Sequence, residues 1–175
     1  MEFYEVIKTR RSVRSYRPDA IPKDVLERVL NAARIAPSAG NRQPWKFIVV
    51  TDEGLRKELV PACNGQTFVA EAPVIIAGVA AFKTHYDEAT YLSTMFRVVD
   101  VSIALDHLTL AARAEGLGTC WIGAFSGEAV KKVLSIPDDV QVVALTPLGY
   151  PAGKGFAETG SRKPLEEIIC HEKFA

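Results

Sequence analysis

Guanidinium groups surround one serine near the start of the chain, in the segment 10–14, which reads RRSVR. Between residues 8 and 17 there are five basic residues and no acidic one, although the whole chain carries 21 of each. Guanidinium groups bind phosphate through paired, charge-assisted hydrogen bonds, each contributing about 1.5–3 kcal/mol. The segment is therefore either a clamp for a compact anion or an ordinary solvated basic surface. The candidate ligands are Arg10, Arg11, Ser12 and Arg14.

A second polar cluster lies in the segment 36–45, APSAGNRQPW. Ser38, Asn41 and Gln43 stand between Pro37 and Pro44, which stiffen the turn. Such a loop can offer amides, a hydroxyl and backbone groups to a flat heterocycle. An ordinary turn that ends a helix is the alternative interpretation.

Two further segments could complete a binding site. In EGLGTCWIGAF, residues 115–125, Gly123 lacks a side chain, so backbone can approach a ligand closely and an N–H there could donate to a ring nitrogen. In SRKPLEE, residues 161–167, Arg162 and Lys163 either complete an anion site or lie in water.

The elements that must position these residues follow from hydrophobic periodicity. The pattern predicts helices over 22–36, 52–59 and 89–115 and another after Ser126, and strands over 45–51, 72–82, 120–123 and 140–150. The helix over 89–115 is apolar nearly all round, so it needs cover on more than one side. We expect a partner subunit to supply that cover, with wrapping by the same chain as the alternative.

Composition excludes several classes of protein. A chain of 175 residues predicts a single domain over 1–175, and zero net charge argues against nucleic-acid binding. The longest apolar run, 72–82, is too short to cross a bilayer, and the N-terminal MEFYEVIK is not a secretion signal, so a cytoplasmic protein is expected. The cysteines and histidines are scattered, so neither a disulfide framework nor a metal site is expected.

Nucleotide-binding loops are not supported either. The stretch from Gly155 to Gly160 has the Walker spacing, but Ser161 and Arg162 follow where Lys and Ser or Thr are needed, and no G-x-G-x-x-G occurs. The glycine-rich stretch 149–164 is better interpreted as a loop beside a site.

Six motifs in order resemble the nitroreductase family of FMN-dependent oxidoreductases, from Phe3 to the C-terminus. They are R-R-S-x-R, A-P-S-x-x-N-x-Q-P-W, A-P-x-x-I, G-L-G-x-x-W-I-G, L-G-Y-P and R-K-P-L-E-E. The resemblance implies an α+β fold: a three-layer α/β/α sandwich with a mixed, mainly antiparallel sheet, in a domain-swapped homodimer. The C-terminal tail resembles a segment that adds a strand to the partner's sheet.

The resemblance also implies roles for individual residues. Arg10, Arg11, Ser12 and Arg14 would hold the phosphate and ribityl chain of FMN, with Arg14 toward the pyrimidine edge. The other subunit would supply a second group: Pro37, Ser38, Ala39 and Asn41. Ile122 and Gly123 would face flavin N5 and O4, Arg162 and Lys163 would reach the phosphate, and Gln66 would lie near the pyrimidine side.

The family relationship implies hydride transfer from NADH or NADPH through the flavin to nitroaromatics, quinones or free flavins, with ping-pong kinetics. No amino-acid nucleophile is required, so the Cys120 thiol is expected in the core or pocket wall. Alternatives are reductive dehalogenation, flavin breakdown, a flavin-binding protein without turnover, and a non-catalytic anion-binding module. The region 82–91 is brief where relatives often have a lid; its rim candidates are Lys83, His85 and Tyr86.

Overall fold

The computed structural model describes residues 1–81, 91–153, 155–157 and 162–174. Within these residues, one antiparallel sheet has the strand order β1-β2-β4-β3. Ser12 makes an additional isolated bridge to Thr119 in the parallel sense. The strands are β1 (Trp45–Val50), β2 (Val74–Ala80), β3 (Gly118–Thr119) and β4 (Gln141–Gly149).

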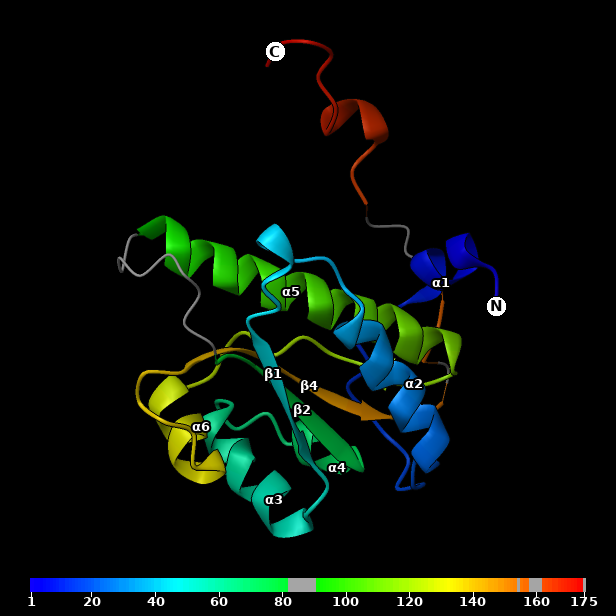
Figure 1. Cartoon of the computed structure of the whole chain (residues 1–175). Coiled ribbons are helices and arrows are strands. Elements are labelled where there is room, and N and C mark those ends of the chain that lie inside the picture. Colours follow the sequence, from blue (N-terminus) through cyan, green and yellow to red (C-terminus); the bar gives the residue numbers. More distant parts are fainter. Residues whose placement is uncertain (82–90, 154, 158–161, 175) are drawn as a thin grey trace.

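Helices cover both faces of the sheet, so the predicted three-layer α/β/α arrangement is confirmed (Figure 1). One face packs against α2 (Lys23–Arg34) and α5 (Tyr91–Ala114), and the other against α3 (Glu53–Ala62) and α6 (Gly127–Leu134). The remaining helical segments are α1 (Phe3–Thr9), α4 (Phe68–Glu71), and the short turns η1 (Ala39–Asn41) and η2 (Leu165–Glu167).

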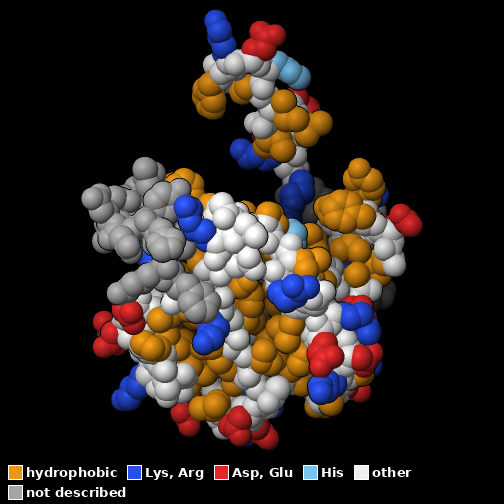
Figure 2. Space-filling model, viewed as in Figure 1, with side chains coloured by type: hydrophobic (Ala, Val, Ile, Leu, Met, Phe, Trp, Pro, Cys, Tyr) orange, Lys and Arg blue, Asp and Glu red, His pale blue; other side chains and the backbone are white. Residues whose placement is uncertain are grey.

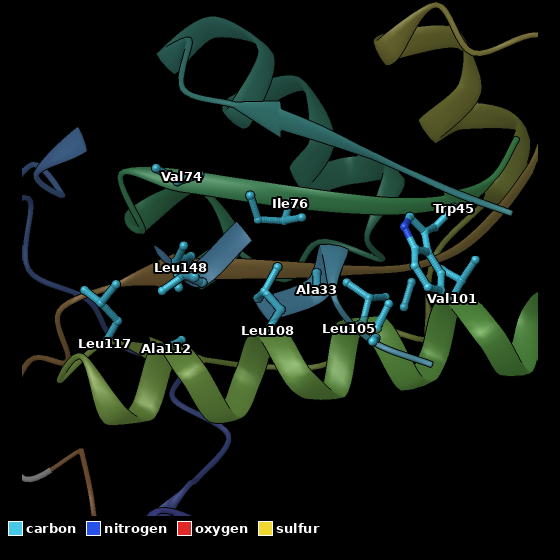
Figure 3. Packing of buried hydrophobic residues seen from close by; sticks show 14 of the residues in the cluster. Ala33, Trp45, Val74, Ile76, Val101, Leu105, Leu108, Ala112, Leu117 and Leu148 are labelled. Atoms are coloured by element: carbon cyan, nitrogen blue, oxygen red, sulfur yellow. The ribbon is translucent and has the colours of Figure 1, made fainter. Parts of the chain in front are cut away.

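The long helix α5 lies across the sheet with one apolar side inward. Val101, Leu105 and Leu108 are buried against β2 and β4 (Figure 3). The approach is close at Gly78, where a Cβ atom would lie 2.7 Å from Leu105 Cδ1. On the first half of α5, Val99 is 44% exposed, so the described residues do not cover α5 at this point.

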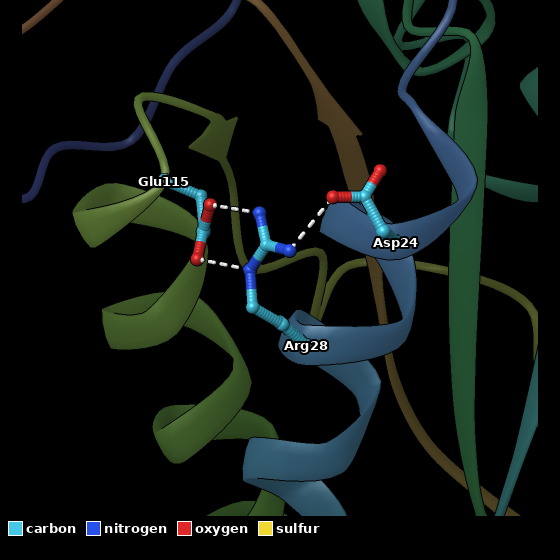
Figure 4. A network of polar contacts seen from close by, with 3 residues as sticks. All are labelled: Asp24, Arg28 and Glu115. Atoms are coloured by element: carbon cyan, nitrogen blue, oxygen red, sulfur yellow. Dashed lines mark hydrogen bonds and ion pairs between the residues drawn. The ribbon is translucent and has the colours of Figure 1, made fainter.

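A charged triad joins α2 to the C-terminal end of α5. Arg28 donates from Nε and Nη2 to Glu115 at 2.8 and 2.9 Å, and from Nη1 to Asp24 at 2.8 Å (Figure 4). These hydrogen bonds lower the pKa of both carboxyl groups. Because the triad is exposed, it orients the two helices more than it stabilises the fold.

The predicted helices are present with shifted ends. Asp52 begins α3 by accepting a hydrogen bond from the Leu55 N–H at 2.8 Å, and Ser126 begins α6 by accepting from the Ala129 N–H at 3.3 Å. The helix α3 continues to Ala62, beyond the predicted end at residue 59. The short helices α1 and α4 were not predicted.

The predicted strand over 120–123 is wrong. The strand lies two residues earlier, at Gly118–Thr119, because the Cys120 N–H donates to the Thr146 hydroxyl at 3.2 Å instead of to a backbone carbonyl. The ladder to β4 is interrupted there. Ile122 rejoins β4 through an isolated bridge to Leu145.

The C-terminal segment 162–174 projects away from the body of the molecule (Figure 1). Its apolar side chains lie in the open: Leu165 is 65% exposed, Ile168 64% and Phe174 100%. Figure 2 shows these hydrophobic groups on the tail. No helix in the described residues combines the length and apolarity needed to cross a bilayer, and no acidic, His or Cys cluster suited to a metal ion occurs among them.

Candidate functional site

Backbone pairing places the basic segment 10–14 beside β3. The Val13 N–H donates to the Thr119 carbonyl at 2.8 Å. A Cβ atom at Gly118 would lie 2.6 Å from Val13 Cγ2, a distance that real Cβ atoms do not show. The glycine is thus required for the two segments to approach each other.

The chain that follows is paired as well, with the segment after β4. Arg17 donates its N–H to the Tyr150 carbonyl at 2.9 Å, and Ala152 donates to the Ser15 carbonyl at 3.0 Å. Between them, Tyr16 is buried and donates its hydroxyl to the Val13 carbonyl at 2.7 Å. Burial raises the pKa of this phenol, so it stays protonated. The basic segment therefore rests on a rigid support.

Charges from the basic segment converge on Cys120. Burial raises the pKa of this thiol, while Arg14, a hydrogen bond with Ser12 and the charge of Arg10 act in the opposite direction. The Nη2 atom of Arg11 is buried with no hydrogen-bond partner in the described residues. A buried donor without an acceptor costs free energy, so this guanidinium fits an anionic ligand.

The segment at residues 122–123 offers one backbone donor rather than two. Ile122 donates its N–H to the Leu145 carbonyl at 2.8 Å and accepts from the Leu145 N–H at 3.2 Å, so its backbone groups are already used. Gly123 is exposed, and a Cβ atom there would meet nothing within 4 Å. Among the described residues, none accepts a hydrogen bond from the Gly123 N–H.

Gln66 is brought to this same region. Its Nε2 donates to the Cys63 carbonyl at 2.9 Å and to the Ala124 carbonyl at 3.3 Å. The Ser126 N–H donates to the Ala62 carbonyl at 2.8 Å, which holds the two loops together. Gln66 thus lies beside the segment that follows Gly123, and no hydrogen bond to its side-chain oxygen occurs within the described residues.

The loop 37–41 is attached to a different place, the first half of α5. The Ala39 N–H donates to Asp100 Oδ1 at 3.0 Å, and the Ser38 hydroxyl accepts from the Gln43 N–H at 2.9 Å. Gly40 and Asn41 have φ angles of 57° and 56°, so the loop makes a tight left-handed turn. Pro37 and Asn41 are exposed at its surface.

Within one chain, the two halves of the predicted site lie far apart. Asp100 anchors the loop 37–41, whereas Arg113 contacts α1 at Thr9, next to the basic segment. At the rise of an α-helix, Asp100 and Arg113 are separated by about 20 Å along α5. This separation agrees with the expectation that the loop serves the other subunit's site, which remains a prediction.

The second basic pair is not brought to the first. Arg162 and Lys163 are exposed in the projecting tail, where Lys163 Nζ lies 3.9 Å from Glu167 Oε2. The lid-rim candidates Lys83, His85 and Tyr86 lie outside the described residues.

Comparison with known proteins decides the family. The nitroreductase family model matches residues 7–68 and 63–150, a range that includes the basic segment, the loop 37–41 and Gly123. The chain belongs to the nitroreductase family. The protein is therefore an oxidoreductase.

Its relatives within the nitroreductase family differ in reaction. A protein of Archaeoglobus fulgidus named as a candidate NADH dehydrogenase/NAD(P)H nitroreductase is 37% identical, over 92% of each chain. The 5,6-dimethylbenzimidazole synthase of Rhodospirillum rubrum is 31% identical, over 81% of this chain and 78% of its own. The crystal structure of a nitroreductase family protein from Clostridium novyi NT superposes with a TM-score of 0.81 at 39% identity, covering 88% of this chain and 87% of that one.

Sequence reasoning missed the residues that anchor the site. Asp100 and Arg113 hold the loop 37–41 and the end of α1, yet neither was singled out. Both are buried charged residues on α5, most of whose residues are apolar. Charged residues within a mostly apolar helical pattern could have identified these two positions, because a buried charge requires a partner.

Proposed function

We propose that the protein is an FMN-dependent oxidoreductase that takes hydride from NADH or NADPH and reduces nitroaromatics, quinones or free flavins. The observation that carries this proposal is the buried, unpartnered Nη2 of Arg11 in a basic segment held rigidly beside β3. A phosphomonoester is the compact anion that such a guanidinium cluster binds best.

The residues present fit FMN along its length. Arg10, Arg11 and Ser12 would hold the phosphate and ribityl chain, and Arg14 would lie toward the pyrimidine edge, where positive charge stabilises the reduced ring. The Gly123 N–H would donate to flavin N5, since the Ile122 donor is already committed to Leu145. Ile122 then supports Gly123 from the core, and Gln66 would complete the pyrimidine side. Bound FMN supplies the hydride-accepting and electron-donating chemistry.

We further propose that two chains build each site. The partner would contribute its loop 37–41, with Pro37, Ser38, Ala39 and Asn41, and Arg162 with Lys163 would reach the phosphate once the tail docks. Three observations support this arrangement: the distance between the two halves of the site within one chain, the exposed apolar side of α5, and the exposed hydrophobic groups of the tail.

The deciding experiment is a visible absorption spectrum of freshly purified protein, followed by additions of NADH and then NADPH without oxygen. We expect a flavin spectrum that bleaches with at least one nicotinamide and recovers when a quinone or nitroaromatic is added. Recovery in the absence of residual nicotinamide would establish that donor and acceptor use the site in turn. A protein that stays colourless after incubation with FMN would refute the proposal.

A second candidate function is flavin breakdown, favoured by the identity with 5,6-dimethylbenzimidazole synthase. Chromatography of the products, after the protein is incubated with reduced FMN and oxygen, distinguishes the two candidate functions. Appearance of 5,6-dimethylbenzimidazole would favour the second candidate, whereas intact flavin together with turnover of added quinone would favour the first.

A further inference from the structure

Arg113 is a buried cation close to the basic segment. Its side chain is only 8% exposed, near the C-terminal end of α5. Its Nε donates to the Thr9 hydroxyl at 2.9 Å, and its Cζ lies 4.0 Å from the centre of the Phe156 ring. No carboxylate among the described residues pairs with it.

On one side, Arg113 fixes the point where the basic segment begins. Thr9 is the last residue of α1, and its hydroxyl donates to the Glu5 carbonyl at 2.6 Å while accepting from Arg113. The chain then leaves the helix at Arg10 and is next held where Val13 bonds to Thr119. Arg10, Arg11 and Ser12 therefore span the interval between two fixed points, of which Arg113 provides the first.

On the other side, Arg113 stacks on Phe156, which packs beneath the basic segment. Phe156 packs against the buried cluster formed by Val13, Tyr16 and Ala72. It follows the segment 150–152 that pairs with residues 15–17. A cation over an aromatic face is attracted by the ring, which holds both groups in place.

A buried cation without an acidic partner is costly, and a neutral side chain of similar shape could fill the same space at less cost. The three arginines that follow Thr9 in the basic segment, Arg10, Arg11 and Arg14, have the same sign as Arg113. A bound dianion would offset the charge of all four groups. The position of Arg113 is thus explained better by a phosphate nearby than by packing alone.

We propose that Arg113 is a positioning residue of the phosphate site. It holds Thr9 and Phe156 so that the guanidinium groups of Arg10 and Arg11 converge, and its charge adds to the positive potential there. The inference rests on the proposed function, because it takes the phosphate of FMN as the anion.

The test compares FMN with riboflavin, which lacks the phosphate. Dissociation constants are measured by flavin fluorescence on full-length, flavin-free protein for the wild type, Arg113→Met and Arg113→Lys. We expect Arg113→Met to weaken FMN binding by at least about tenfold while riboflavin binding changes less than about twofold, and Arg113→Lys to recover part of the loss. A residue that served the fold alone would weaken both ligands equally.

Two further variants keep the test decisive. Arg28→Met removes the ion pair with Glu115 at the same end of α5, and both dissociation constants should stay unchanged. Thr9→Val removes the hydroxyl that accepts the hydrogen bond of Arg113, with little change in side-chain shape. This variant replaces Arg113→Met in the test if Arg113→Met does not fold. It should lower FMN affinity selectively, by a smaller factor.

The outcomes separate this inference from the proposed function. If the wild type binds FMN and the ratio of FMN to riboflavin affinity is the same in Arg113→Met, or in Thr9→Val where that variant decides, Arg113 is not a positioning residue and the proposed function stands. If the wild type binds no FMN, the proposed function fails and this inference fails with it.

Discussion

Among single residues, the three cysteines have contrasting environments. Cys63 and Cys120 are buried and Cys170 is exposed. Burial raises the pKa of Cys63 to about 11 and also raises that of Cys120, where Arg14, Ser12 and Arg10 oppose the effect. Because the thiolate is the reactive form, neither buried thiol is suited to act as a nucleophile near neutral pH. This agrees with chemistry that needs no cysteine.

Alkaline pH should therefore destabilise the fold through Cys63. Its pKa is higher in the folded than in the unfolded chain, so its contribution to the free energy of unfolding is present below pH 9 and is lost as the pH rises toward about 11. Urea unfolding across this range should show the decline. Cys63→Ala should make the decline shallower without abolishing it, because the pKa values of Cys120 and Tyr16 are also raised by burial. An unchanged pH dependence in that variant would exclude a contribution from Cys63.

Arg10 and Arg11 should control cofactor retention without controlling assembly. The double variant Arg10→Ala, Arg11→Ala removes two guanidinium groups from the proposed phosphate site, including the unpartnered Nη2. We expect largely colourless protein that still dimerises, with FMN affinity reduced by about a hundredfold or more. Absorbance ratios of purified protein and light scattering measure the two properties. Full FMN occupancy would show that the phosphate lies elsewhere.

At the level of elements, the candidate site depends on close contact between the basic segment and β3. Gly118 and Val13 touch where a Cβ atom would overlap with the valine, and Gly78 and Leu105 show the same kind of contact between β2 and α5. Packed interiors tolerate such overlaps poorly. Small residues at these two places set how near the layers and the basic segment can approach.

Gly118→Ala should move the basic segment away from β3. We expect a loss of about 1–3 kcal/mol in the free energy of unfolding, from overpacking against Val13, together with weaker FMN binding. Gly127→Ala is the matched control, because a Cβ atom there meets nothing within 4 Å and should change stability by less than about 0.5 kcal/mol. Chemical denaturation compares the two, and equal stabilities would contradict the prediction.

For the whole molecule, the described chain leaves large apolar groups in water. Phe3, Val99 and Ile168 are 61, 44 and 64% exposed, on α1, α5 and the tail respectively. Where exposed apolar groups form one continuous patch, another protein commonly covers it. A second copy of the chain is the proposed occupant, because the loop 37–41 and the basic segment belong to one proposed site but lie apart in one chain.

Removing the tail should separate the proposed subunits. The full chain should have twice the 19.1 kDa of one subunit by light scattering. A chain ending at residue 161 should shift toward the monomer and retain less FMN, because it lacks the tail that we propose covers the partner. Cys170→Ser is the control and should stay dimeric. A truncated chain that remains fully dimeric would contradict the proposed role of the tail.

The sequence by itself determined the family, the layered fold and most elements. Periodic apolar residues mark α2, α5 and the buried strands, and Asp52 and Ser126 mark helix starts through their capping oxygens. These features are local, so they can be recognised without knowing the contacts of the rest of the chain. The helix α1 was not predicted because it buries only Val6 and Thr9, which are too few residues to form a periodic pattern.

Tertiary structure alone decided which candidate residues meet. The basic segment lies beside β3 through the Val13–Thr119 hydrogen bond, the strand stops where the Thr146 hydroxyl takes the Cys120 N–H, and Arg113 links Thr9 with Phe156. Each of these contacts joins residues more than twenty-five positions apart in the chain, and such pairings depend on the path of the whole chain rather than on neighbouring residue types. That is why the sequence could supply the ligands of the proposed phosphate site but not the buried Arg113 that we propose positions them.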